Sequence, residues 1–258
     1  MLTILEALIL GIIQGITEWL PVSSSGHLAL FQNAFGMQVP VLYDIFLHVA
    51  TVLVLLIFFR RRLLRVIKAI AKLDFNSEDG RLALFVVIGS IPTAIIGFLF
   101  KGLFKTFFYS ILAVGIALIV TGFILLFSES RKEKKSLGWK DSVFIGIAQG
   151  IAIIPGISRS GATISTALLR GVRREEAAEF SFILAIPAII GAAVFDFSPE
   201  AFAEINLAAI IAGMMAAFVV GYLSLSWLMK LIRRRMFHYF GWYCLILGAA
   251  MATAGLLI

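Results

Sequence analysis

Residues 11–27 read GIIQGITEWLPVSSSGH, and residues 146–162 read GIAQGIAIIPGISRSGA. The second segment repeats the first, so that Gln14 corresponds to Gln149 near the start of each segment. Each segment begins as an apolar stretch that is too short to cross a bilayer, and it is then interrupted by Pro, Gly and Ser. Two interrupted segments in corresponding positions of the two halves of a membrane protein are the best indication that a sequence gives of the binding site.

The composition is that of an integral membrane protein. Hydrophobic residues make up 61% of the chain and charged residues only 14%, whereas a soluble domain carries about a quarter charged residues. The formal charge of +7 would suit nucleic acid, but the basic residues are distributed as membrane topology requires, so nucleic acid is not an expected partner. The single cysteine, Cys244, excludes an internal disulfide, and the sequence has no CxxC, HExxH or EF-hand pattern that would indicate a preformed metal site.

Six segments are long enough to cross the roughly 30 Å of hydrocarbon in a bilayer. They are 41–59, 82–100, 107–127, 177–195, 207–229 and 238–258. We expect each of them to form one transmembrane helix.

Two further regions, 1–36 and 141–171, do not fit simple spans. Each reads as a short helix, an interruption and a second short helix; we call the interruptions the first break (residues 21–26) and the second break (residues 155–161). The serines of each break can cap the second helix. Irregular backbone at membrane depth is tolerated only where it is buried in protein or lines a polar cavity. We therefore predict two re-entrant hairpins, made of four half-helices.

The basic residues support this arrangement. If each hairpin enters and leaves on the same face, four loops fall on one side and carry 7, 5, 3 and 4 Lys and Arg, 19 of the 22 in the chain. The opposite side holds only Lys101, Lys105 and an acidic loop at 196–206. The positive-inside rule makes the basic side cytoplasmic. The four basic loops are 60–81, 128–141, 170–176 and 230–236.

Under this topology the first hairpin hangs from the outer face and the second from the cytoplasmic face, so the two copies are inverted. The predicted fold is an all-α integral membrane protein with six transmembrane helices and two re-entrant hairpins in an inverted-topology repeat. It forms a single polytopic domain (1–258), with repeats at roughly 1–127 and 141–258 and a linker at 128–140. We expect the protein in the plasma (inner) membrane, surrounded by membrane lipids, and a homodimer is one possible assembly.

Almost all the interior ionisable groups lie at or next to the two breaks: Glu18 and His27 flank the first break, and Arg159 lies in the second. An ionisable side chain inside a membrane is costly, so a functional role is the default interpretation. The alternative is that Glu18 and Arg159 form a buried structural ion pair. That alternative leaves the polar residues around them unexplained.

This set of side chains indicates a phosphate site. Half-helix N-termini near Ser24 and Ser160 present free N–H groups and a positive dipole end, and Arg159 adds a fork suited to phosphate oxygens. Glu18 and Gln14, one helical turn apart, can hold a divalent cation through oxygen. Ser24 or a water is the candidate nucleophile, with a histidine or carboxylate at the break as its base. The other candidate substrate-binding residues are Ser23, Ser25, Gly26, Ser158, Gly161 and Thr163.

The remaining interior polar residues are weaker candidates for a functional role. His48, in the first full span, fits a core histidine better than a catalytic one. Asp44 could support the site or lie at the interface, and Glu179 could orient a neighbour or cap its helix. His238 sits beside aromatic residues and reads as an interface residue.

The two motifs together resemble those of the undecaprenyl-diphosphatase family, the integral membrane phosphatases tied to bacitracin resistance. The family carries an (E/Q)xxxE motif leading into PVSS(S/T)GH, and a second motif PGxSRSxxT. Here residues 14–18 match the first motif, residues 21–27 read PVSSSGH, and residues 155–163 read PGISRSGAT. The resemblance covers the whole chain, and both motifs at this spacing are highly specific.

The resemblance implies removal of the terminal phosphate of a C55 polyprenyl diphosphate, which returns the monophosphate carrier lipid to cell-wall glycan synthesis. It implies a divalent cation, Mg²⁺ or Ca²⁺, and a site that faces the outer side. By position, Glu18 corresponds to the essential acidic residue and metal ligand, His27 to the catalytic histidine, Arg159 to the phosphate clamp and Ser24 to the proposed nucleophile. Gln14 is the permitted variant of the first motif position, so a second carboxylate at the cation is not expected.

Two other classes of membrane protein share features with this sequence. Type 2 phosphatidic acid phosphatases also use SGH and SR motifs, but they need a histidine soon after the arginine, and none lies between Ser160 and Arg170. A transporter or flippase of a phosphorylated lipid or anion is the main alternative, because inverted repeats with broken helices are a transporter architecture. Transport needs Arg159 for binding but has less use for Ser24, His27 and Glu18 together.

Overall fold

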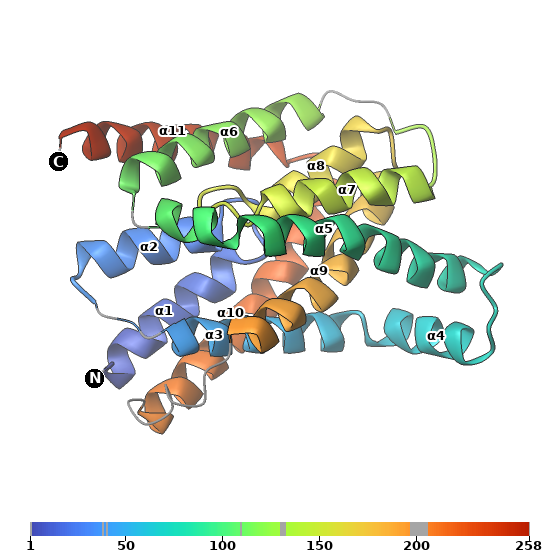
Figure 1. Cartoon of the computed structure of the whole chain (residues 1–258), viewed down its shortest axis with the longest axis horizontal. Helices are drawn as coiled ribbons and strands as arrows, with labels where there is room; N and C mark the ends of the chain where they lie inside the picture. Colours follow the sequence, from blue (N-terminus) through green and yellow to red (C-terminus); the bar gives the residue numbers. More distant parts are fainter. Residues whose placement is uncertain are drawn as a thin grey trace.

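The computed structural model describes residues 2–37, 39, 41–108, 110–129, 133–196 and 206–257, and within them the fold is built from helices (Figure 1). These are α1 (Ile4–Thr17), α2 (Ser24–Ala34), α3 (Val41–Phe58), α4 (Arg60–Ala71), α5 (Glu78–Phe108), α6 (Ile111–Glu129), α7 (Trp139–Ile151), α8 (Arg159–Leu169), α9 (Arg174–Asp196), α10 (Leu207–Arg233) and α11 (His238–Leu257).

Each of the six expected spans corresponds to a helix. By length and composition, α5, α6, α9, α10 and α11 can each cross a membrane, and α3 is a sixth candidate when it is taken together with α4. The chain is therefore a multi-pass α-helical membrane protein. The span expected at 107–127 begins too early, because α5 continues to Phe108 and α6 begins only at Ile111.

The stretch 60–81, predicted as a loop, contains the helix α4. This helix is bent by 80° from the end of α3. Its basic side chains alternate with Leu64, Ile67 and Ile70, all of which are exposed. A helix with this mixed surface suits a membrane–water interface. Because α4 is highly charged, it is not one of the long apolar segments of the sequence.

Both interrupted regions form two short helices separated by non-helical residues, as predicted. The hydroxyl of Ser23 accepts the N–H of Gly26 at 3.3 Å and so caps α2. The hydroxyl of Ser158 accepts the N–H of Gly161 at 3.1 Å and so caps α8 in the same way. In Figure 1, the ends of α1 and α2 that lie away from the first break are at the left, whereas the ends of α7 and α8 that lie away from the second break are at the right.

Small residues bring the backbones of paired helices together. The helix α1 packs on α10, α7 packs on α5, and α6 packs on α11. A Cβ atom at Gly11 of α1 would lie 2.3 Å from the carbonyl oxygen of Gly213 of α10, and one at Gly146 of α7 would lie 2.1 Å from the carbonyl oxygen of Gly89 of α5. Such contacts drive helix association in lipid, where the hydrophobic effect between helices is absent.

Of the predicted basic loops, the turn between α4 and α5 lies at the right of Figure 1, and described residues of the other loops share acidic partners. Ion pairs link them: Glu133 contacts Arg174 at 3.1 Å and Arg235 at 3.3 Å, and Arg62 contacts Glu179 at 2.7 Å. Burial alone would raise the pKa of Glu133, but hydrogen bonds from Arg174 hold that pKa below its usual value. Which compartment this end faces stays a prediction. The predictions for the opposite side, on the side chains of Lys101 and Lys105 and on 197–205, lie outside the described residues.

The contact between α7 and α5 predicts that Gly146→Ala lowers the free energy of unfolding by about 1–3 kcal/mol, because the new methyl group overpacks the interface. Gly191→Ala is the matched control: nothing lies within 4 Å of a Cβ atom there, and alanine is the better helix former. Thermal unfolding of both variants in detergent measures the difference. Equal melting temperatures for Gly146→Ala and Gly191→Ala would contradict this packing.

Candidate active site

The two breaks are in direct contact although they are far apart in the sequence. The backbone N–H of Gly156 donates to Ser23 Oγ at 3.1 Å. From α6, Thr121 Oγ1 donates to the carbonyl of Gly156 at 3.0 Å and accepts the N–H of Ser158 at 3.1 Å. Ser23 has a φ of 67°, a left-handed conformation that is costly for serine and that is typical of functional sites.

Glu18 lies at the centre of this contact and is only 7% exposed. Its Oε1 pairs with Nη2 of Arg159, which joins the end of α1 to the start of α8. Its Oε2 accepts the hydroxyl of Ser24 at 2.6 Å and Nε2 of Gln14 at 3.0 Å. The structure thus brings together four residues that the sequence predicted as one site.

Arg159 is held in place from two sides. One nitrogen pairs with Glu18, and the guanidinium carbon lies 5.8 Å from the ring centroid of Trp19, which is fully buried. Nη1 of Arg159 is buried without a hydrogen-bond partner among the described residues. One edge of the guanidinium is therefore fixed while Nη1 remains available for a ligand. Trp19 was not predicted as a site residue, because it sits in an apolar stretch with no distinguishing signal.

The two helix N-termini have matching arrangements. Ser23 and Ser25 approach each other at 3.3 Å between their hydroxyl oxygens, and Ser158 and Ser160 do so at 3.2 Å. The first N–H groups of α2 and of α8 have no acceptor within their own helix. Both helices start at the contact between the breaks, so both present donors and a positive dipole end to an anion there.

The other predicted substrate-binding residues support the shape of the site. A Cβ atom at Gly26 would lie 3.5 Å from Cα of Gly156, and one at Gly161 would lie 3.3 Å from Cβ of Pro21. Thr163 donates its hydroxyl to the carbonyl of Arg159 at 2.7 Å. In this structure these residues hold the two breaks close together and fix the start of α8.

His27 is held away from the carboxylate. Its Nδ1 lies 2.8 Å from the carbonyl oxygen of Ser23, and its Nε2 lies 2.7 Å from the hydroxyl of Tyr243 in α11. A carbonyl can only accept, so Nδ1 carries the proton and Nε2 accepts from the tyrosine. No hydrogen bond in the described part of the chain joins His27 to Ser24 or Glu18. The catalytic role expected for His27 stays a prediction.

His48, for which a core position was favoured, lies beside the carboxylate. Its Nε2 is 3.7 Å from Oε2 of Glu18, and its Nδ1 donates to the carbonyl of Asp44 at 2.7 Å. The side chain is 33% exposed. No sequence pattern links His48 to Glu18, because the two lie on different helices.

The cluster can hold a divalent cation only with help from a substrate. Among the described residues, no group of three or more His, Cys, Asp and Glu side chains could ligate a metal. Glu18 offers a carboxylate, and Oε1 of Gln14 is buried without a hydrogen-bond partner in the described chain. Two protein oxygens together with phosphate oxygens and water are a common arrangement for Mg²⁺, so the residues present fit such an ion.

The second segment does not build an equivalent carboxylate site. Gln149, the counterpart of Gln14, donates to the carbonyl of Leu184 at 3.3 Å. Ile153 stands one helical turn after Gln149, in the position that Glu18 has relative to Gln14. The repeat therefore forms one site, to which the first half contributes the carboxylate and the second half the arginine.

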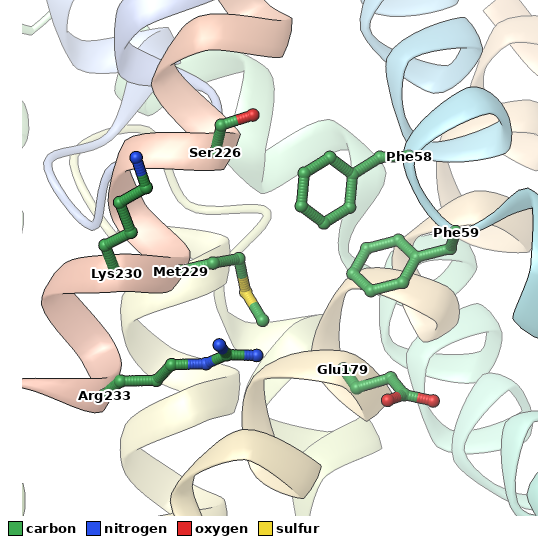
Figure 2. Close-up of a pocket in the computed structure, with 7 residues that line it drawn as sticks. All are labelled: Phe58, Phe59, Glu179, Ser226, Met229, Lys230 and Arg233. Carbon is green, nitrogen blue, oxygen red and sulfur yellow. The ribbon is translucent and has the colours of Figure 1, made fainter.

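A separate pocket of about 370 Å³ lies between α3, α9 and α10 (Figure 2). In Figure 2, Phe58 and Phe59 lie on one side of it and the basic Lys230 and Arg233 of α10 lie on the other, and none of the predicted catalytic residues lines it. Its lining residues are Phe58, Phe59, Glu179, Ser226, Met229, Lys230 and Arg233. Glu179, at its edge, pairs with Arg62 at 2.7 Å, so its role in this structure is to tie α9 to α4.

Comparison with known proteins finds one family over almost the whole chain. A family model described as "Bacitracin resistance protein BacA" matches residues 7–250. The chain is 45% identical over 256 residues to a protein of Carboxydothermus hydrogenoformans named undecaprenyl-diphosphatase, with 95% of each chain covered. Proteins of the same name from Methanosphaera stadtmanae and Methanobrevibacter smithii are 38% and 40% identical, with 96% and 95% of each chain covered.

The pair formed by Glu18 and Arg159 predicts strong energetic coupling. Removing either partner leaves the other charge buried, so Glu18→Gln and Arg159→Gln should each cost about 3–5 kcal/mol of stability. The double variant should cost less than the sum by about 1–3 kcal/mol. The exposed pair of Arg233 and Glu175, 3.2 Å apart, is the control and should couple by under about 1 kcal/mol. Unfolding in detergent measures both cycles, and additive effects in the first would refute the pairing.

Proposed function

The chain belongs to the BacA family of bacitracin resistance proteins, and we propose that it removes the terminal phosphate of undecaprenyl diphosphate where its two breaks meet. It is a membrane-bound phosphatase that releases inorganic phosphate and leaves undecaprenyl monophosphate. The observation that supports this place is Nη1 of Arg159, which is buried without a hydrogen-bond partner in the described part of the chain. The other terminal nitrogen of the same guanidinium pairs with Glu18, the carboxylate that accepts the hydroxyl of Ser24.

The terminal phosphate binds between the two halves. Nη1 of Arg159 donates to one of its oxygens, and the first N–H groups of α2 and α8 donate to others. Negative charge grows on these oxygens in the transition state, and fixed donors stabilise it without reorganisation. The polyprenyl tail stays in the lipid between the spans, so it needs no closed apolar cavity.

Ser24 attacks the terminal phosphorus. Its hydroxyl proton passes to Oε2 of Glu18, to which it already donates at 2.6 Å. The bond between the phosphorus and the bridging oxygen breaks, and the lipid monophosphate leaves. Water then attacks the phosphoserine, and Ser24 departs and recovers its proton from Glu18. His27 keeps the first break in position through its bonds to Ser23 and Tyr243.

Glu18 and Gln14 would hold a divalent cation, Mg²⁺ or Ca²⁺, which when bound would supply positive charge opposite the diphosphate. The residues of the chain still perform the recognition of the terminal phosphate and the proton transfer.

The architecture that suits this function is an inverted-topology repeat of 1–127 and 141–258. Packing supports it: α1 lies on α10 and α7 lies on α5, which is the same contact exchanged between the halves, and α6 lies on α11. The pairs α1–α2 and α7–α8 are re-entrant hairpins in the plasma membrane. The basic end faces the cytoplasm by the positive-inside rule, and the site opens to the outer side. Whether the protein forms a homodimer stays a prediction.

Arg159→Ala should lower the rate of phosphate release from undecaprenyl diphosphate by about 10²–10³-fold, the usual cost of losing a transition-state donor. Arg159→Lys should restore little, because lysine cannot contact Glu18 and the phosphate at once. Phosphate release by the purified protein in detergent is the measurement, and Lys68→Ala, at an exposed position on α4, is the control. No release by folded wild-type protein with any cation would favour the transporter.

The serine mechanism predicts a covalent intermediate. After rapid acid quenching with substrate labelled on the terminal phosphate, the label should be found on Ser24. Ser24→Ala should abolish both the labelling and the release of phosphate. If Ser24→Ala releases phosphate at the wild-type rate, water rather than the serine is the nucleophile.

A further inference from the structure

The pocket between α3, α9 and α10 has no part in the proposed phosphatase reaction, and its lining is amphipathic (Figure 2). Phe58 and Phe59 form an apolar wall on α3, and Met229 adds an apolar side chain from α10. Lys230 and Arg233 stand on the side of α10, three positions apart and therefore on one helical face. An occupant with an apolar part and a negative charge would satisfy both sides.

The basic side chains of the pocket are able to bind an anion. In Figure 2 the guanidinium of Arg233 reaches towards the centre of the pocket. Its Nε contacts Glu175 at 3.2 Å, but these two side chains are 62% and 66% exposed, and an ion pair as exposed as this contributes little. Lys230 is exposed, and no ion pair between described residues involves it. Its flexible stem lets its ammonium group turn to the same anion as Arg233.

The pocket has groups for binding an anion but lacks those proposed for hydrolysis. Ser226, the hydroxyl of its lining, donates to the carbonyl of Tyr222 at 2.8 Å within its own helix, whereas Ser24 of the candidate active site donates to a carboxylate. Glu179, the carboxylate of the lining, is paired with Arg62 at 2.7 Å. A phosphate bound here is therefore held and not cleaved.

The surface of α10 continues from the pocket as an apolar stripe. Tyr222, Val219 and Met215 precede Ser226 by 4, 7 and 11 positions, which places them on its face of the helix. All three are exposed, and the ring of Tyr222 lies 5.9 Å from that of Phe58, so the stripe adjoins the aromatic wall. At about 1.5 Å per residue the stripe is about 16 Å long, which is about half of the roughly 30 Å of hydrocarbon in a bilayer. This length suits an acyl chain in one leaflet.

We propose that this pocket binds the head group of an anionic phospholipid of the surrounding bilayer. Arg233 and Lys230 hold its phosphodiester, the aromatic wall covers the start of its chains, and one acyl chain lies along the stripe of α10. Basic pockets between membrane helices bind anionic lipid head groups in this way. The occupant is a resident lipid and not the diphosphate substrate, so the proposal does not depend on the phosphatase site.

The test is native mass spectrometry of the full chain in detergent, freed of copurified lipid and titrated with phosphatidylglycerol or with phosphatidylcholine of the same acyl chains. We expect the wild type to bind phosphatidylglycerol about tenfold more tightly. Lys230→Gln/Arg233→Gln should remove this preference, because each cation contributes about fivefold. Lys68→Gln/Lys72→Gln is the matched control: it removes two charges from exposed positions of α4 outside the pocket and should keep the preference.

Equal binding of the two lipids by the wild type would overturn the proposal. An equal loss in both double variants would overturn it as well, because it would indicate general attraction to a basic surface. So would soluble glycerol phosphate that binds as tightly as the lipid, or a dimer that takes up no lipid, since free phosphate or a second copy would then be the occupant. If Lys230→Gln/Arg233→Gln does not fold, Lys230→Gln alone, at an exposed position, should still weaken binding of phosphatidylglycerol about fivefold, and unchanged binding would refute the proposal.

Discussion

The ion pair between Glu18 and Arg159 is the interaction on which the site depends. It joins the two interrupted segments, one from each half of the chain. Each charge would be too costly to bury alone, so each one holds the other in place. Because the carboxylate uses one oxygen for the arginine, the other is left for Ser24 and Gln14. The guanidinium uses one nitrogen for Glu18, and Nη1, which has no hydrogen-bond partner among the described residues, is the donor proposed for the phosphate.

Two sets of contacts keep this pair in place. The glycines of α1 and α7 let these helices contact α10 and α5 at backbone distance, which fixes the segments that lead into the two breaks. The hydrogen bonds of Gly156 and Ser158 to side chains of the opposite break and of α6 satisfy the irregular backbone. Exposed to lipid, the same backbone would cost several kcal/mol for each unpaired group.

The sequence predicted the parts of the site that lie within the two motifs. Pro, Ser and Gly interrupt long apolar segments, so the breaks, their serine caps and the charged residues at the breaks could be located without a structure. The partners of these residues could not. Trp19, His48 and Tyr243 lie within apolar stretches, and Tyr243 is 216 positions from His27, so only the packing of the helices places them at the site. The helix α4 could not be predicted in this way, because a helix as short and as charged as α4 has neither the length nor the hydropathy of a span.

The most direct measurement of the central claim is an experimental structure with a methylene-bridged analogue of undecaprenyl diphosphate, which cannot be hydrolysed at that bridge. The account predicts that the terminal phosphonate lies on Nη1 of Arg159 and within reach of Ser24, between the N-termini of α2 and α8. A terminal phosphonate bound elsewhere, for example at the basic edge of the pocket between α3, α9 and α10 in Figure 2, would contradict it.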